Sequence, residues 1–290
     1  MAVPPESFPR PDLRDHTVLV LHAHPDDESI FTGITLRRLA DAGARTVLVM
    51  ATGGELGGSR TVLGPGETVR HRRLAELDRA AALLGVARVV HLGRRDSGLP
   101  RWGACSVPGS LAAADVLVLA RRVAELAAAE GAATLVYDDE HGVYGHPDHR
   151  AVHRIGAAAA AMAGATGFLT TVDREHLHGS AGGRHLVQAA AAAAAVPFGR
   201  TRAEIAVSVC GGARHLACKR AAMTAHGSQI GPGDLPVAGF PEVYGVEWFG
   251  RAGPRGVLDL LDDGHRSTAG GTVRDRPATG GRSQPARAGT

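Results

Sequence analysis

The chain has 290 residues, of which 44% are hydrophobic and 4% aromatic, and its formal net charge is +3. The apolar share suffices for a folded core, which excludes a chain that is disordered throughout. No stretch approaches the roughly 18 consecutive apolar residues of a membrane span, and the start lacks a basic segment followed by an apolar run. We therefore expect a cytoplasmic protein that does not contact a membrane.

The two ends of the chain differ in composition from its middle. Residues 1–15 are polar and Pro-rich, which predicts an N-terminal arm. Residues 264–290 carry five arginines and one aspartate among Gly, Pro, Ser and Thr, which predicts a disordered basic tail. A single domain is expected over 16–263, and because this body is nearly neutral we expect no nucleic-acid partner. None of the cysteines forms a C-x-x-C pair, which argues against a disulfide framework.

Short β-branched runs alternate with helical segments along most of the chain. Strands are predicted at 17–23, 46–51, 86–92, 134–137, 204–209 and 243–249, and helices at 29–42, 68–84, 112–130, 149–163 and 213–225. A glycine follows four of these five helices, as is common at a helix C-terminus. The alternation predicts an α/β fold with an open, mostly parallel, Rossmann-like sheet and helices on both faces. The alanine stretch at 189–195 is given no chemical role.

Histidines and carboxylates follow two of the predicted strands. The first strand runs into H-P-D-D-E at 24–28, and the fourth runs into D-D-E-H-G-V-Y-G-H-P-D-H at 138–149. In a doubly wound sheet the ligand site lies at the carboxyl ends of the strands, so the two segments should converge. Imidazole and carboxylate are the ligands of a catalytic zinc, which takes three protein ligands and keeps one position for water.

Each segment also has a simpler interpretation, because acidic residues are favoured at a helix N-terminus by the helix dipole. Finding both segments after apolar strands favours a metal site over two ordinary helix starts. The H-P-D-D spacing can present His24 and Asp27 together, with Asp26 beside the metal as a base.

The segments A-H-P-D-D-E at 23–28 and H-P-D-H at 146–149 closely resemble the PIG-L/LmbE-type de-N-acetylase superfamily. The resemblance extends from about residue 17 to about residue 249, and it includes the shorter motifs T-G-G-E, D-S-G and H-G-S-Q. It implies one zinc ion per chain, or another divalent metal, held by His24, Asp27 and His149.

The same resemblance implies the roles of the neighbouring side chains. Asp26 would be the general base. His146 would be the protonated imidazole that stabilises the oxyanion and protonates the leaving amine, and Asp148 would orient it. Tyr144 resembles the mobile tyrosine that some members of the superfamily aim at the tetrahedral intermediate.

Four further residues match positions that the superfamily uses for substrate binding: Glu55, Arg73, Asp96 and His226. Two of them have simpler interpretations. Arg73 could form an i, i+3 surface pair with Glu76, and Asp96 could start a turn.

The resemblance implies zinc-dependent hydrolysis of the N-acetyl amide of a small, soluble, glucosamine-type amino sugar, in natural-product or small-thiol biosynthesis. Two alternatives stay open: an amidase of the same superfamily that acts on a thiol conjugate of a glucosaminyl-inositol, and an inactive sugar-binding relative. A dinucleotide-binding enzyme is excluded because the first strand runs into H-A-H-P-D-D instead of G-x-G-x-x-G. The sequence leaves the oligomeric state open, a homo-oligomer included.

Overall fold

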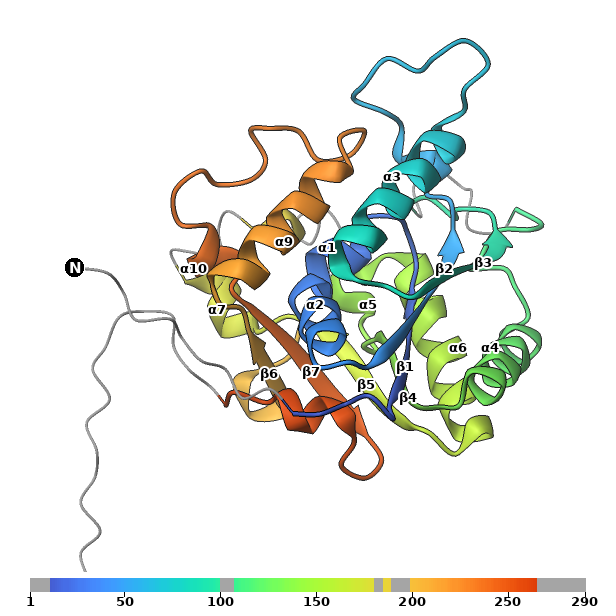
Figure 1. Ribbon diagram of the computed structural model, residues 1–290. Coiled ribbons are helices and arrows are strands. Elements are labelled where there is room, and N and C mark those ends of the chain that lie inside the picture. The colour runs from blue at the N-terminus through green and yellow to red at the C-terminus, as the bar shows by residue number, and fades with distance from the viewer. Residues whose placement is uncertain (1–10, 100–106, 180–184, 189–198, 265–290) are drawn as a thin grey trace, which may run out of the picture.

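The computed structural model describes residues 11–99, 107–179, 185–188 and 199–264. Within them, seven strands form one sheet in the order β3-β2-β1-β4-β5-β7-β6 (Figure 1). The strands are β1 (Thr17–His22), β2 (Arg45–Thr52), β3 (Arg88–Arg94), β4 (Ala132–Asp138), β5 (Thr166–Thr171), β6 (Val207–Cys210) and β7 (Val246–Ala252). The first five pair in parallel, whereas β7 is antiparallel to both of its neighbours. This confirms the predicted open, mostly parallel sheet.

Helices cover both faces of the sheet (Figure 1). On one face lie α2 (Gly33–Asp41), α3 (Val69–Leu84) and α9 (Ala213–Ala225), and on the other lie α4 (Val116–Glu130) and α6 (Pro147–Ala163). A hydrophobic core lies on each face of the sheet. Alternate residues of β1 pack into one core or the other, because successive side chains of a strand point to opposite faces. Val18 and Val20 belong to the first core, whereas Leu19 and Leu21 belong to the second.

Shorter helices flank the sheet edge at which the strands end: α1 (Asp27–Phe31), α5 (Gly142–Gly145), α7 (Arg174–His178) and α10 (Phe240–Tyr244). The chain runs outward from β1 through β2 to β3, and then returns to place β4 on the other side of β1. The strand order therefore changes direction between β1 and β4. A crevice at such a switch point is where open α/β sheets bind their ligands.

The helix predicted over 29–42 is in fact two helices, α1 and α2, which meet at Thr32 with φ −133° and ψ 11°. The Glu247 carboxylate of β7 accepts the N–H groups of Ile34 and Thr35, both at 2.8 Å, and so caps α2 from outside. Lys219 pairs with Glu247 at 2.6 Å and donates to the Ile30 carbonyl at 2.7 Å. These partners are far apart in sequence, so local patterns do not reveal the break.

Three strands differ from the prediction. β5 was not predicted, and its glycine weakens the strand pattern; a Cβ atom on Gly167 would come within 2.5 Å of the Tyr137 hydroxyl. The strand predicted over 204–209 begins later, because Thr201 and Glu204 close a capping box around a 3₁₀ turn. The strand predicted over 243–249 also begins later, since α10 extends to Tyr244.

The described ends of the domain pack on its body. Leu13, in the predicted arm, is fully buried and its N–H donates to the Ala42 carbonyl at 2.9 Å. At the other end Asp263 pairs with Arg38 and accepts the Cys210 N–H at 2.8 Å. The alanine stretch, the predicted tail and Cys105 lie outside the described residues. None of the described helices is long and apolar enough to cross a membrane.

Candidate metal centre and active site

The two polar segments meet at the carboxyl ends of β1 and β4, which are neighbours in the sheet. His24 and Asp27 follow β1, and His149 lies in the first turn of α6. One ligand atom from each of these three side chains lies within 4.8 Å of the others, and all three side chains are buried. The structure thus brings together the three residues predicted to hold a metal.

The three side chains are oriented with their ligand atoms facing one another. His149 Nδ1 lies 2.7 Å from the Asp138 carboxylate, and His149 Nε2 faces Asp27 Oδ1 at 3.5 Å. His24 Nδ1 lies 3.7 Å from Asp27 Oδ2. A carboxylate on the far nitrogen is how metal-binding histidines are usually held. Two imidazoles and one carboxylate also form a typical donor set for zinc, so these residues fit a divalent metal.

Negative charge accumulates around His24. Burial alone would lower the pKa of this imidazole, but Asp148, Asp96 and Asp27 outweigh burial and raise its pKa well above the usual value. In the same way burial opposes ionisation of Asp138, yet His149 and His22 lower its pKa to about 2. The centre therefore favours positive charge, as a cation site should.

Asp26 lies beside these ligands in an unusual backbone conformation, with φ 124° and ψ −28°. Its N–H donates to Glu28 Oε2 at 3.0 Å, and its carboxylate accepts from Arg73 Nη2 at 3.0 Å. Burial raises the pKa of Asp26, Arg73 lowers it and Asp27 raises it, with a net value of about 6. Asp26 is therefore a carboxylate at neutral pH and has a pKa suited to a general base.

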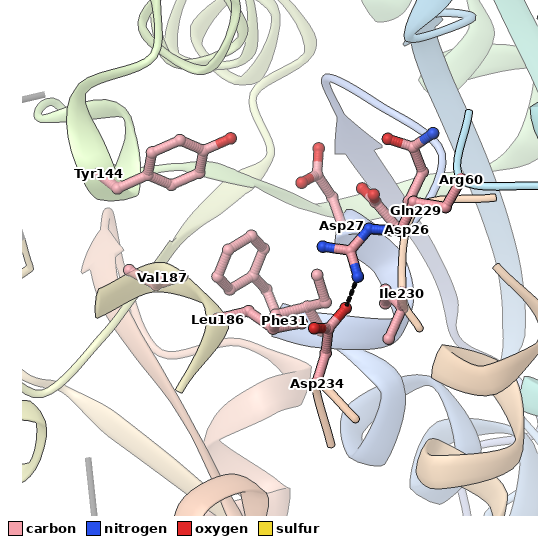
Figure 2. A pocket seen from close by; sticks show the side chains of 11 residues that line it. Asp26, Asp27, Phe31, Arg60, Tyr144, Leu186, Val187, Gln229, Ile230 and Asp234 are labelled. Atoms are coloured by element: carbon pink, nitrogen blue, oxygen red, sulfur yellow. Dashed lines mark hydrogen bonds and ion pairs between the residues drawn. The ribbon is translucent and has the colours of Figure 1, made fainter. Parts of the chain in front are cut away.

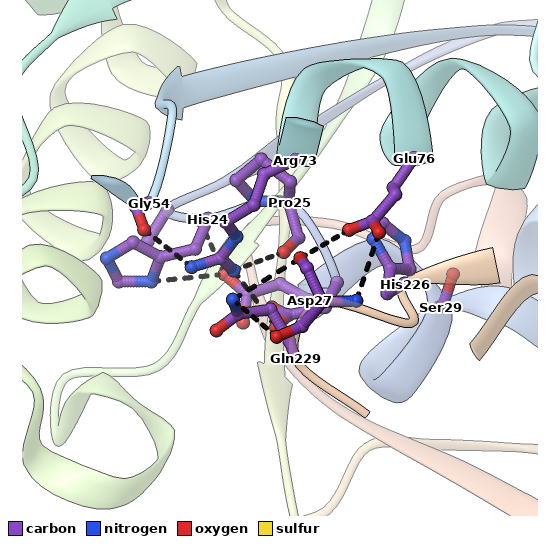
Figure 3. A network of polar contacts seen from close by, with 12 residues as sticks. His24, Pro25, Asp27, Ser29, Gly54, Arg73, Glu76, His226 and Gln229 are labelled. Atoms are coloured by element: carbon purple, nitrogen blue, oxygen red, sulfur yellow. Dashed lines mark hydrogen bonds and ion pairs between the residues drawn. The ribbon is translucent and has the colours of Figure 1, made fainter. Parts of the chain in front are cut away.

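Arg73 reaches from α3 into the H-P-D-D turn (Figure 3). It is almost fully buried and donates to the Gly54 carbonyl at 2.7 Å and to the Pro25 carbonyl at 2.5 Å, besides Asp26. Glu76, one turn farther along, accepts the N–H and the hydroxyl of Ser228 at 3.0 Å and 2.5 Å. The alternative surface pair of Arg73 with Glu76 is not what the structure contains, because each side chain binds a different loop.

His226 is fully buried behind the same turn (Figure 3). Its Nε2 lies 2.7 Å from Glu28 Oε1, and Ser29 Oγ donates to that oxygen at 2.6 Å. Burial would raise the pKa of Glu28, but His226 outweighs burial and lowers it to about 2. Glu28 is thus a fixed carboxylate that holds the backbone of Asp26.

A second group of side chains lies on the other side of His24. Asp148 Oδ2 accepts the Ser97 N–H at 2.9 Å and lies 3.1 Å from His24 Nε2. The ring of His146 meets that of His24 edge-on, with centroids 4.7 Å apart. Burial and the neighbouring rings His24 and His149 lower the pKa of His146 to about 3, so His146 is neutral before substrate binds.

Asp148 was predicted to orient His146, and the structure gives its carboxylate a different contact. Only the backbone N–H of Asp148 reaches His146, donating to Nδ1 at 3.2 Å. The carboxylate holds His24 instead. This contact fits a buried carboxylate that fixes a metal-binding imidazole.

Tyr144 approaches the centre from α5. Its hydroxyl lies 3.2 Å from His149 Nε2. Burial and the carboxylates of Asp27 and Asp26 raise its pKa well above the usual value, so it stays a neutral donor. The preceding residue, Val143, is fully buried with φ 57° and ψ −61°. Such dihedrals are rare for a β-branched residue and lie near those of a strained γ-turn.

Asp96 and Glu55 come from the loops after β3 and β2. Asp96 Oδ1 lies 3.6 Å from His24 Nε2, and its other oxygen accepts the Leu56 N–H at 3.1 Å. Glu55 accepts the Asp96 N–H at 3.2 Å. Asp96 thus belongs to the centre, and Glu55 supports it from behind.

A cavity of about 200 Å³ opens beside the metal-ligand group. Tyr144 and Val187 lie on one side of it and Gln229 and Arg60 on the other (Figure 2). Arg60 pairs with Asp234 at 2.5 Å within the polar part of the lining. The complete lining is Asp26, Asp27, Ile30, Phe31, Arg60, Tyr144, Leu186, Val187, Gln229, Ile230 and Asp234.

Comparison with known proteins agrees with this geometry. Residues 19–160 match the family model of PIG-L, described as GlcNAc-PI de-N-acetylase. A Catenulispora acidiphila protein described as 1D-myo-inositol 2-acetamido-2-deoxy-alpha-D-glucopyranoside deacetylase 2 is 34% identical over 242 residues, and the match covers 74% of this chain and 80% of that protein. A Thermobispora bispora protein described as a deacetylase of the same compound is 32% identical over 280 residues, 84% of this chain and 91% of its own. The chain belongs to the PIG-L family.

Membership of the PIG-L family confirms both the resemblance seen in the motifs and the predicted enzyme class, a deacetylase that hydrolyses an amide bond. The fold agrees as well. The N,N'-diacetylchitobiose deacetylase of Pyrococcus horikoshii superimposes with a TM-score of 0.52 at 20% identity, covering 81% of this chain and 83% of its own.

None of the four predicted substrate contacts of this PIG-L chain lines the cavity, and two of them are enclosed by other partners. Arg73 is committed to the turn that carries Asp26, and His226 is enclosed with Glu28, so neither side chain faces the cavity. Asp138 and Glu28 were given no role from the sequence, although Asp138 opens the polar segment that follows β4. The cavity wall at Leu186 had no sequence signal, because it comes from a short helical segment far from either motif.

Proposed function

We propose that the protein is a metal-dependent deacetylase that removes the acetyl group from an N-acetylglucosamine joined to inositol. The observation that carries the proposal is the convergence of His24, Asp27 and His149 beside Asp26, at a cavity that Asp26 and Asp27 line. The descriptions of the relatives supply the substrate. They favour the glucosaminyl-inositol core, which the amidase alternative had named, over an unspecified soluble amino sugar.

A divalent cation such as Zn²⁺, held by His24, Asp27 and His149, would polarise the amide carbonyl and lower the pKa of the attacking water. Asp26 accepts the proton of that water. Its pKa of about 6 keeps it ionised at neutral pH while leaving it basic enough to take a proton. Because Arg73 and Glu28 hold Asp26 from two sides, the base is positioned before substrate arrives.

His146 and Tyr144 supply hydrogen-bond donors on the other side of the reacting carbonyl. His146 Nδ1 accepts the Asp148 N–H, which assigns the proton of the neutral ring to Nε2. Burial keeps the ring neutral at first. Negative charge that develops on the substrate oxygen favours the imidazolium form, so as water attacks, His146 gives up the Asp148 N–H bond and takes a proton from solvent at Nδ1. His146 then passes its Nε2 proton to the leaving amine, and Asp26 releases the proton of the water to solvent.

The sugar is proposed to lie along the polar part of the cavity. Arg60, Gln229 and Asp234 offer donors and acceptors that suit hydroxyl groups. Neither Asp96 nor Glu55 lines this cavity, so neither is proposed as a sugar contact. The partner is thus a small molecule, zinc is the proposed metal, and the cytoplasm is the proposed compartment.

The proposal is tested by measuring amine and acetate release from three compounds with metal-loaded protein. We expect the highest kcat/KM for the N-acetylglucosaminyl-inositol and a lower value for free N-acetylglucosamine, and Asp26→Asn should lower the turnover of both by about 10²- to 10⁴-fold. Activity restricted to a thiol conjugate of glucosaminyl-inositol would establish the amidase alternative. Binding of the sugar without turnover by the wild-type protein would establish an inactive sugar-binding relative.

A further inference from the structure

His24 faces a different carboxylate with each of its ring nitrogens. Nδ1 lies 3.7 Å from Asp27, on the side of the metal-ligand group described above. Nε2 lies 3.6 Å from Asp96 Oδ1 and 3.1 Å from Asp148 Oδ2. The two nitrogens of an imidazole point away from one another, so one ring can serve two separate sets of ligands.

The second group of ligand atoms shares only His24 with the first group and needs neither Asp27 nor His149. His24, Asp96 and His146 each offer a ligand atom within 4.8 Å of the other two, and all three side chains are buried. His146 Nδ1 accepts a backbone N–H, which leaves Nε2 as the nitrogen able to bind a ligand. The loop at Asp96 is held by the Leu56 and Gly98 N–H groups, at 3.1 Å and 2.7 Å.

A second observation, the unpartnered Oδ1 of Asp148, indicates excess negative charge beside His24 Nε2. Asp148 is fully buried, and its Oδ1 has no hydrogen-bond partner among the described residues. Asp148 and Asp96 thus place two buried carboxylates on the Nε2 side of His24. A buried carboxylate is costly unless it is paired or binds a metal, and a single ion on the Nδ1 side would leave this side uncompensated.

We propose that His24, Asp96 and His146 form a second divalent-cation site, which shares His24 with the first site and inhibits hydrolysis when it is filled. Imidazole and carboxylate ligands together favour zinc and similar transition metals over magnesium or calcium. Binding at His24 Nε2 displaces the proton of that nitrogen into solvent. Filling the site also converts His146 from a proton donor into a ligand. The binding stands independently of the proposed function, whereas the inhibition rests on it.

Metal stoichiometry tests the binding. The full chain is stripped with a chelator and titrated with Zn²⁺, and bound metal is measured by calorimetry and by elemental analysis after equilibrium dialysis. We expect two equivalents for the wild type, the second weaker than the first. Asp96→Asn should keep the first equivalent and lose the second, His149→Ala should do the opposite, and His24→Ala should lose both.

The variants are checked by circular dichroism and thermal melting, and His146→Gln provides a second way to remove the new site if Asp96→Asn fails to fold. His71→Ala is the matched control, because His71 is an exposed histidine on α3 away from both ligand sets. It should keep two equivalents. One equivalent in the wild type at saturation, or a second equivalent that survives both Asp96→Asn and His146→Gln, would overturn the proposed site.

Activity measured along the same titration tests the inhibition. Deacetylation should rise up to one equivalent of Zn²⁺ and then fall by about 10²- to 10⁴-fold as the second binds, the usual cost of losing a general acid–base group. Full activity with two ions bound would refute the inhibition. A wild type that binds two ions and hydrolyses none of the substrates at one equivalent would refute the proposed function and leave the second site standing.

Discussion

The segments that follow β1 and β4 build the two halves of the centre by different means. Each contains one non-glycine residue with positive φ, Asp26 in the first and Val143 in the second, and the described residues contain no others. Polar bonds from Glu28 and Arg73 hold Asp26, whereas Val143 is held by burial and by its N–H bond to Asp139 at 2.8 Å. Strained conformations of this kind persist only where the surroundings impose them.

The two segments thus support different functions, one the proposed base and the other a proposed metal ligand. The first segment fixes the position and the pKa of a base, so its bonds act on the reacting carboxylate itself. The second segment supplies imidazole and phenol donors, and its supporting carboxylate, Asp138, acts on a metal-binding ring. Loss of the Asp26 carboxylate should therefore impair the chemistry, and loss of the Asp138 carboxylate should impair metal binding.

The largest expected effect comes from the base. Asp26→Asn should keep the metal and lower kcat by about 10²- to 10⁴-fold, because general acid–base help is lost. Bound metal and turnover are measured on the same preparation. Wild-type turnover in this variant would remove Asp26 from the mechanism, and loss of the metal would show that the two functions are not separate.

The next largest effect is expected on metal affinity, from a change in the segment that follows β4. Asp138→Asn removes the charge that holds His149 Nδ1 at 2.7 Å, and metal affinity should fall by about 10- to 100-fold. The affinity is measured by competition with a chromogenic chelator. Asp139→Asn is the matched neighbour, since the Asp139 carboxylate accepts the Val143 N–H and the Thr171 hydroxyl and contacts none of the proposed metal ligands. Equal losses in both variants would argue against the specific role of Asp138.

A smaller change should appear in the pH profile. Asp26 must be ionised to act, so kcat/KM should fall as pH drops through its pKa of about 6, or somewhat lower when a cation is bound beside it. Arg73 lowers this pKa, so Arg73→Gln should move the acidic limb upward by about one pH unit. Arg73→Lys keeps the charge and should leave the limb near its original position. A limb that does not move in Arg73→Gln would mean that another group controls it.

The smallest effect is expected from a change that touches neither segment. Truncation after Gly264 keeps the contacts of Asp263 with Arg38 and Cys210, which close the domain. Turnover and melting temperature should stay close to the full-length values, because the removed residues are polar and lack an apolar face. A large loss of folded protein would contradict the predicted domain boundary.

The sequence predicted that His24, Asp27 and His149 come together, because their placement follows from local patterns. A β-branched run ends at His22, a second ends at Asp138, and parallel strands bring their ends to one edge. The roles of Arg73 and His226 could not be predicted in this way. Their partners, Pro25 and Glu28, lie some fifty to two hundred residues away, and no spacing rule joins them.

The same limit explains the misplaced elements. The break at Thr32 depends on Glu247 capping α2 from β7, and β5 was missed because Gly167 accommodates Tyr137 of the neighbouring strand. Both are tertiary contacts that override local preference. The residues that line the cavity could not be predicted for a related reason. Apolar residues such as Leu186 line it only because segments far apart in sequence come together in the fold.

Lys219 is the only lysine of the chain, and it is buried with 1% of its surface exposed. It joins Glu247 to the Ile30 carbonyl in α1, the helix that carries Asp27. Amine-reactive reagents should therefore modify the chain terminus readily and reach Lys219 only when this junction opens. Burial lowers the pKa of Lys219 against the opposing effect of Glu247, and because this effect of burial ends when the amine is uncovered, the uncovered amine should react as an ordinary lysine. A single mass shift on the peptide containing Lys219 would thus report how often the metal-bearing helix detaches from the sheet.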